Sequence, residues 1–213
     1  EQGEPMGIGQ FPKLRNVTTK DIFCRNPIGN GSAPVIRRAL LEEMAIDIRT
    51  FYGDRKVCFN EALRQSEDIE FWLRVALKGK WRFEGIDAPL TFYRVNSSGL
   101  SANLEKQFES WQKAVDFNRN GNEDFFGRWY TLAKAYQYRY LARRAVQSGN
   151  SKAAINLAVK ALKSNLRILF EEPGRTCATC LCALLTKLPR KLYHKLENVG
   201  MALIGRKVSE PSV

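Results

Sequence analysis

The segment SEDIEFWLRVALK, residues Ser66 to Lys78, gives the clearest indication of secondary structure in the chain. Its apolar residues recur at helical spacing, at Ile69, Trp72, Leu73 and Ala76. This spacing predicts an amphipathic helix with one buried stripe. Ser66 is a suitable N-cap residue, and Gly79 follows the segment in the position where helices commonly end.

Two adjacent carboxylates, Glu67 and Asp68, lie in the first turn of this predicted helix. The helix macrodipole favours negative charge there, so both side chains can stay ionised. An ionised carboxylate beside a pocket can act as a general base. Carboxylates in a first helical turn are also common as capping features, and the pair alone does not decide between these two interpretations.

The chain has 213 residues, and 44% of them are hydrophobic, which is typical of a globular protein with one large or two small domains. Its net charge of +12 is unevenly distributed. Residues 1–120 hold 18 basic and 16 acidic side chains, whereas residues 121–213 hold 16 and 6. The basic second part suggests an anionic partner surface, or simply a solvated helical surface. Nucleic acid is disfavoured, because Trp129 and Tyr136 fall at core spacing rather than on an exposed platform.

The first part of the chain is predicted to mix helices and strands, and the part after residue 103 to be helical. Helices are expected at residues 18–24 (N-cap Thr18 or Thr19), 39–44, 104–118, 125–147, 151–169 and 176–188, and strands at 33–37, 81–86 and 90–95. Residues 128–166 resemble one tetratricopeptide-type hairpin. A single such unit must pack on another surface.

Five cysteines, unevenly spread, suggest reduced thiols in a cytoplasmic setting. Cys177, Cys180 and Cys182 are spaced so that they could share a metal ion or accept a lipid chain. Zinc generally needs four ligands, and His194 is the only histidine. Apolar packing is therefore the favoured interpretation of these cysteines.

Several motifs follow one another in a definite order. They are NPIGNGS at residues 26–32, VIRR at 35–38, the helix segment at 66–76, PLTFYR at 89–94 and SGLS at 98–101. Over residues 20–105 this order closely resembles the C-terminal half of family 2 glycosyltransferases, which have the GT-A fold. The resemblance implies an α/β fold: the acceptor-side part of a Rossmann-like GT-A domain at residues 1–112, followed by a basic helical extension at 113–213.

The resemblance also implies an activity, namely transfer of a sugar with inversion from a nucleotide-sugar donor to an acceptor hydroxyl, in polysaccharide or lipid-linked glycan synthesis. In that family the Glu-Asp pair contributes the base, so Asp68 is the expected base and Glu67 its positioning partner. The expected substrate-binding residues are Asn30, Ser32, Arg64 and Arg94. Mg²⁺ or Mn²⁺ would neutralise the diphosphate leaving group.

Two departures from the family pattern qualify this expectation. No Asp-x-Asp metal motif occurs in the sequence, and Asn96 stands where many members have histidine. We therefore expect a C-terminal fragment that has no metal site and is inactive alone. The basic extension would place the enzyme on the inner face of the plasma membrane, near lipid-linked acceptors. The alternative is a non-catalytic helical module that binds an anionic membrane or protein partner.

Overall fold

The computed structural model describes residues 11–29, 31–50, 53–88, 90–91 and 103–188. These residues form eight α-helices and one two-stranded antiparallel sheet. The predicted α/β fold is therefore wrong: the described part of the chain is mostly helical and contains no Rossmann-like sheet. The helices are α1 (Thr19–Arg25), α2 (Arg38–Met44), α3 (Glu67–Lys78), α4 (Leu104–Phe117), α5 (Glu123–Gln147), α6 (Ser151–Ser164), α7 (Arg167–Glu171) and α8 (Pro173–Leu185).

The two strands lie where the sequence predicted none. β1 (Ile46–Thr50) pairs with β2 (Gly53–Val57), with Ile46 opposite Val57. The expected strands at residues 33–37 and 81–86 are not formed, and the expected strand at 90–95 lies largely outside the described residues. The segment around Gly85 instead runs against residue 14: the Gly85 amide donates to the Leu14 carbonyl at 2.7 Å. A Cβ on Gly85 would lie 2.5 Å from the end of the Leu14 side chain and 3.3 Å from the Leu14 Cα, so a larger residue there would require Leu14 to shift.

Helix α1 begins as the sequence predicts, with Thr18 as N-cap. The Thr18 hydroxyl accepts from the Asp21 amide, and the Asp21 carboxylate accepts from the Thr18 amide, which completes a capping box. The helix ends at Asn26, which adopts the left-handed conformation. Its buried residues Phe23 and Cys24 join the core formed with α3, α4 and α5.

Helix α3 lies at the centre of the packing, between two apolar clusters. Leu73 belongs to the cluster that includes Phe23, Trp111 and Phe126 from α1, α4 and α5. A second group of α3 side chains packs instead with α1 and α2: Phe71, Trp72, Val75 and Ala76. The single buried stripe predicted from the sequence is thus too narrow, because α3 is covered on two faces. The first cluster contains side chains from both predicted parts of the chain, residues 1–112 and 113–213, so these two parts share one hydrophobic core.

The ends of α3 confirm one capping prediction and contradict the other. Gly79 has φ +67° and its amide donates to the Ala76 carbonyl, as expected for a residue that ends a helix. Ser66 precedes the helix, but it has φ +64° and its hydroxyl makes no capping hydrogen bond. The first-turn amides are therefore not satisfied by the serine that the sequence suggested.

The C-terminal half is a layer of packed helices. α5 and α6 form a helical hairpin around Gly149, which has φ +70°, and α8 packs on both. The predicted helix over residues 151–169 is interrupted, because Asn165 is extended and separates α6 from α7. Asn150 caps α6, and its side chain accepts from the Ala153 amide.

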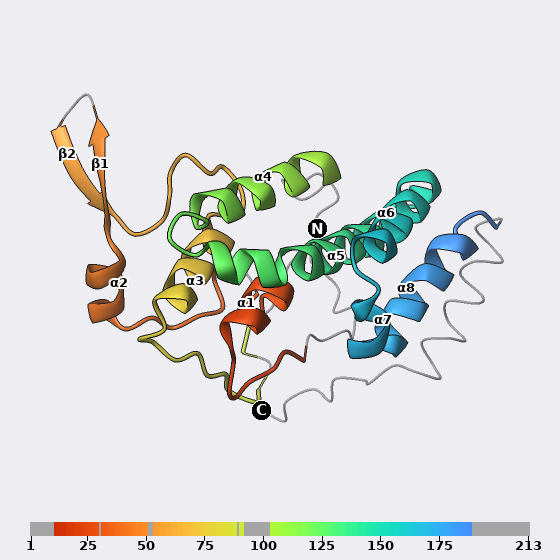
Figure 1. Cartoon of the computed structure of the whole chain (residues 1–213), viewed down its shortest axis with the longest axis horizontal. Coiled ribbons are helices and arrows are strands. Elements are labelled where there is room, and N and C mark those ends of the chain that lie inside the picture. Colours follow the sequence, from red (N-terminus) through yellow and green to blue (C-terminus); the bar gives the residue numbers. More distant parts are fainter. Residues whose placement is uncertain (1–10, 30, 51–52, 89, 92–102, 189–213) are drawn as a thin grey trace.

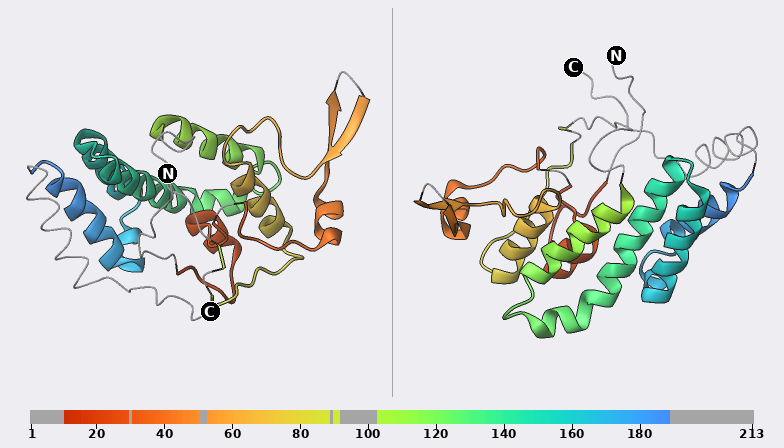
Figure 2. Two further views of the ribbon diagram at one scale, coloured as in Figure 1. Left: turned by 180° about the vertical axis from the view of Figure 1, so that it is seen from behind. Right: turned by 90° about the horizontal axis from the view of Figure 1, so that it is seen from above.

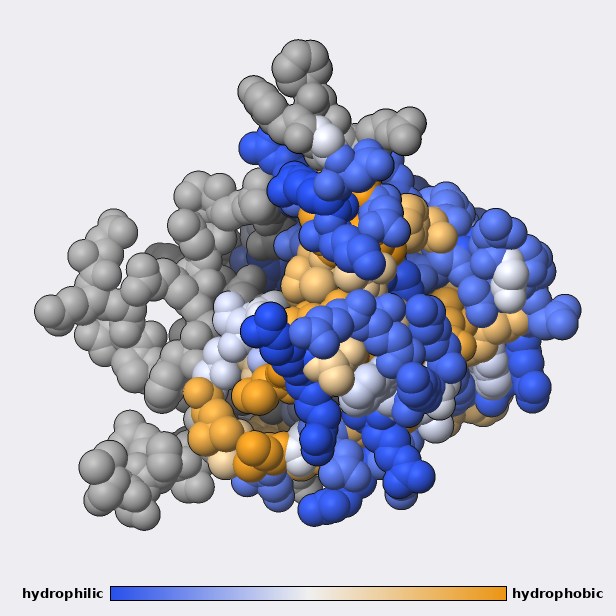
Figure 3. Space-filling view, turned by 90° about the vertical axis from the view of Figure 1, so that its left-hand side faces the viewer, coloured by the Kyte–Doolittle hydropathy of each residue, from blue (hydrophilic) through white to orange (hydrophobic). Residues whose placement is uncertain are grey.

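The elements are arranged along one long axis. β1, β2 and α2 lie at one end and α8 at the other, with α1, α3, α4 and α5 between them (Figure 1). The views from behind and from above agree with this arrangement (Figure 2). Seen from the end that carries α2 and the strands, the surface is mostly hydrophilic, with small groups of hydrophobic side chains (Figure 3).

Candidate functional site

The N-terminus of α3 carries the acidic pair that the sequence singled out. Glu67 and Asp68 are the first two residues of the helix, and both are partly buried. One carboxylate oxygen of Asp68 accepts from the Ile69 amide at 2.7 Å. Burial raises the pKa of Asp68, and the neighbouring charge of Glu67 adds to this shift. No cation in the described part of the chain forms an ion pair with Asp68, so this carboxylate is a stronger base than an exposed aspartate.

A third carboxylate in the same helix, Glu70, has a different environment. Its side chain is fully buried, and it accepts from Arg74 Nε at 2.7 Å. Asn118 also donates to Glu70, from the end of α4. Sequence reasoning did not single out Glu70 or Arg74, although their i,i+4 spacing is the signal for such a pair. Because this carboxylate is neutralised, it serves the packing of α3 rather than proton transfer.

The other predicted site residues are not assembled around Asp68. Arg64 precedes α3 and is exposed, and it makes no ion pair with a carboxylate of the described residues. Ser32 is exposed in the segment between α1 and α2. Asn30 and Arg94 lie outside the described residues. The structure thus brings together Glu67 and Asp68, and it leaves the substrate-binding role of the other four as a prediction.

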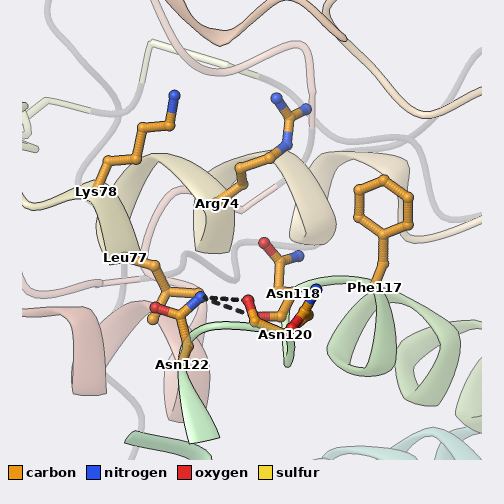
Figure 4. A pocket seen from close by; sticks show the side chains of 7 residues that line it. All are labelled: Arg74, Leu77, Lys78, Phe117, Asn118, Asn120 and Asn122. Carbon is orange, nitrogen blue, oxygen red and sulfur yellow. Dashed lines mark hydrogen bonds between the residues drawn. The ribbon is translucent and has the colours of Figure 1, made fainter. Parts of the chain in front are cut away.

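A shallow pocket of about 220 Å³ lies at the opposite end of α3 (Figure 4). It is lined by Arg74, Leu77 and Lys78 from α3, by Phe117 at the end of α4, and by Asn118, Asn120 and Asn122 from the α4–α5 turn. From the helical rise, Asp68 is about 9–15 Å from these α3 residues along the axis. The side-chain amide of Asn122 donates to the backbone carbonyls of Asn118 and Asn120, so these polar groups stabilise the α4–α5 turn.

The expected divalent cation has no binding site in the described part of the chain. No group of three or more His, Cys, Asp or Glu side chains is close enough there to hold a metal ion. Mg²⁺ is usually bound through one or two carboxylates, with waters and substrate phosphates completing its octahedral shell, so the adjacent pair at the start of α3 does not by itself define a metal site. None of the five cysteines, all of which are among the described residues, forms a disulfide, and Cys177 is exposed on α8.

Comparison with known proteins identifies no relative: no protein-family model, no curated protein and no solved structure matches this chain. Among the described helices, none combines the length and the apolar character that crossing a bilayer would require. The resemblance to family 2 glycosyltransferases therefore rests on the order of the sequence motifs.

The pH dependence of stability offers a test of the Asp68 environment. Because burial raises the pKa of Asp68 above its unfolded value of about 3.9, the ionised carboxylate destabilises the native state. The penalty is absent below the unfolded pKa and grows as the pH rises through the folded pKa. We expect Asp68→Asn to raise the free energy of unfolding at pH 7 and to leave it unchanged near pH 3, as measured by urea unfolding.

Glu123 at the start of α5 provides a control, because its pKa is lowered where that of Asp68 is raised. Backbone amides, including that of Gly121 at 3.0 Å, lower the pKa of Glu123. Glu123→Gln should therefore slightly decrease stability at pH 7. If both substitutions changed stability in the same direction, burial would not be the dominant effect at Asp68.

Proposed function

We propose that this chain supplies the acceptor side of an inverting glycosyltransferase, with Asp68 as the general base. The observation that carries the proposal is the partly buried, unpaired carboxylate of Asp68 at the start of α3. The order of motifs in the sequence supports the same activity, in which the donor is a nucleotide-sugar and the acceptor a glycan or a lipid-linked saccharide. The proposal concerns the chemistry of this carboxylate and does not depend on the α/β fold.

In the proposed reaction Asp68 removes the proton from the acceptor hydroxyl. The acceptor oxygen attacks the anomeric carbon of the donor from the face opposite the leaving group. A new glycosidic C–O bond forms as the bond to the nucleoside diphosphate breaks, so the configuration is inverted and the diphosphate leaves with the bonding electrons. A carboxylate with a raised pKa is better matched to this proton transfer than an ordinary aspartate.

The three carboxylates of α3 differ in their suitability as the base. Glu70 is fully buried and paired with Arg74, so its lone pairs are already used. Glu67 is next to Asp68 and raises its pKa through charge repulsion. Glu67 is therefore assigned a positioning role, in which it keeps Asp68 basic and contacts the acceptor.

The experiment that tests this proposal is a transfer assay on the protein made from its complete reading frame. Release of nucleoside diphosphate is measured with a panel of nucleotide-sugars and saccharide acceptors. We expect Asp68→Asn to reduce kcat by at least about 100-fold, because general bases contribute factors of this size. Retained turnover in a folded Asp68→Asn protein would reject Asp68 as the base.

A matched control is the same substitution in the first turn of another helix. Asp124 is exposed near the start of α5, and Asp124→Asn should leave the rate within about twofold of the natural protein. Circular dichroism of both variants distinguishes loss of the base from loss of the fold. If no donor–acceptor pair in the panel reacts with the natural protein, the proposed transferase activity is contradicted for those substrates.

A further inference from the structure

The outward face of α8 is apolar. Its inward residues Thr176, Thr179 and Ala183 are buried against the neighbouring helices. The residues that alternate with them on the solvent side are Cys177, Ala178, Leu181 and Leu184, all exposed. Leu181 and Leu184 are each 57% exposed. A surface helix normally carries polar side chains on this face, so the stripe has no explanation in the packing of the described residues.

Exposed apolar side chains are concentrated around α8. Of the eleven large hydrophobic residues that are most exposed in the described part of the chain, five lie between residues 159 and 184. One of them, Phe170 on the adjoining helix α7, is 83% exposed. Helices α7 and α8, which carry Phe170, Leu181 and Leu184, are in contact, and α8 lies at the end of the molecule that is farthest from β1 and β2 (Figures 1 and 2).

The charge around this region is strongly positive. Between Glu172 and Glu197 the sequence has no acidic residue and five basic ones, Arg175, Lys187, Arg190, Lys191 and Lys195. The two acidic residues that precede α8 are already paired. Glu171 binds Lys20 at 2.6 Å and Arg167 at 2.8 Å, and Glu172 binds Arg25, Arg139 and, at 3.7 Å, Arg175 of α8 itself. These two carboxylates are shared among five basic side chains, so the charge beside α8 remains net positive and can attract an anionic surface.

We propose that α8 lies in the interface of an anionic lipid bilayer, with the Cys177–Leu184 stripe facing the acyl chains. The helix has 13 residues and is about 20 Å long, too short to cross a hydrocarbon core of about 30 Å. Arg175 and Lys187, near its two ends, would reach the lipid headgroups while the leucines insert between them. This inference is independent of the proposed transferase activity.

The composition of the stripe favours lipid over a protein partner. Protein interfaces concentrate their binding energy in Trp, Tyr and Arg side chains that fill defined pockets. The α8 stripe contains only leucine, alanine and cysteine, and its positive charges lie at the helix ends and beyond. Apolar residues of this kind with surrounding basic residues are typical of helices that lie in the interface of anionic membranes.

The test is sedimentation of the full chain with vesicles of phosphatidylcholine alone and of phosphatidylcholine with phosphatidylserine. We expect binding to the phosphatidylserine vesicles, weakened by salt. Leu181→Ser/Leu184→Ser should reduce the partition coefficient by at least about tenfold, because the inserted apolar area is lost. Arg175→Gln/Lys187→Gln should weaken binding at low salt and have less effect at high salt.

The control for the leucine variant is Val35→Ser/Ile86→Ser, which replaces two residues at least as exposed but outside α7 and α8. This variant should bind vesicles as the natural chain does. Equal loss in both double variants, or binding that survives the leucine substitutions, would overturn the proposal. So would concentration-dependent dimerisation that the leucine substitutions abolish without any vesicle binding, because the stripe would then be a contact between two copies of the chain.

Discussion

An Arg74→Met variant is expected to lose about 3–5 kcal/mol of free energy of unfolding, the usual result of removing one partner of a buried ion pair. Its partner Glu70 is fully buried, so the substitution leaves a carboxylate without a counter-charge inside the protein. Methionine keeps the apolar stem of arginine and removes the guanidinium, so the loss reports the missing charge together with the hydrogen bonds that this group makes. The measurement is equilibrium unfolding in urea at pH 7.

Arg74 does more than neutralise Glu70. Its guanidinium also donates to the Cys58 carbonyl at 2.6 Å and to the Met44 carbonyl. These carbonyls lie just beyond β2 and at the end of α2. The Arg74 side chain thus connects α3 to the chain on both sides of the β1–β2 hairpin. In the Arg74→Met variant, amide hydrogen exchange in β1 and β2 should therefore be faster.

The control is Arg38→Met, which breaks a pair of the same residue types and the same i,i+4 spacing. Arg38 and Glu42 are both exposed in α2, and such pairs contribute well under 1 kcal/mol. Equal losses of unfolding free energy in Arg74→Met and Arg38→Met would show that the burial of Glu70 does not determine the contribution of its ion pair to stability. If Arg74→Met does not fold, Arg74→Lys keeps the charge but loses the forked geometry, and it should show a smaller loss.

The helices were largely predictable from the sequence, because their signals are local. Capping at Thr18, the apolar period in residues 66–78 and Gly79 each depend on side chains within one or two turns. Helix α5 was predicted from Phe125 and starts at Glu123, a difference of the size expected at helix ends. These helices could therefore be predicted without information about tertiary contacts.

The sheet and the polar core were not predictable in the same way. β2 carries four exposed residues and one partly buried one, so its sequence lacks the apolar alternation that identifies a strand. Conversely, residues 81–86 alternate like a strand but have no partner strand. Trp81 instead donates to Glu43 at 3.1 Å, a contact between positions 38 residues apart. The mistaken α/β expectation came from the family resemblance, and the strands predicted from these local patterns agreed with it.

The candidate site was predicted only in part, for a related reason. The adjacency of Glu67 and Asp68 follows directly from the sequence, but the burial that raises the pKa of Asp68 depends on the fold. The role of Glu70 depends on Arg74 and on Asn118, which is 48 residues away. Sequence patterns indicate which residues can carry charge, whereas tertiary packing determines which charge stays available for chemistry.

A Glu172→Gln variant is expected to destabilise the protein by about 3 kcal/mol or more, because it leaves a buried arginine without its carboxylate. Arg139 in α5 is only 8% exposed at its side chain and binds both Glu172 and the Thr176 hydroxyl, the latter at 2.8 Å. Burial and the neighbouring arginines lower its pKa to about 10, so it is still charged at neutral pH. Urea unfolding at pH 7 measures the loss.

Glu172 also joins distant parts of the chain, because it binds Arg25 of α1 as well as Arg139 of α5. Removing its charge places Arg25, Arg139 and Arg175 together without a neutralising group, and their repulsion should loosen α8 first. Hydrogen exchange should therefore increase in α8 more than in α3. Glu42→Gln, in the exposed pair with Arg38, is the control and should change stability by less than about 0.5 kcal/mol. A uniform increase in exchange across all helices would contradict the local role of Glu172, since the cluster would then stabilise only the fold as a whole.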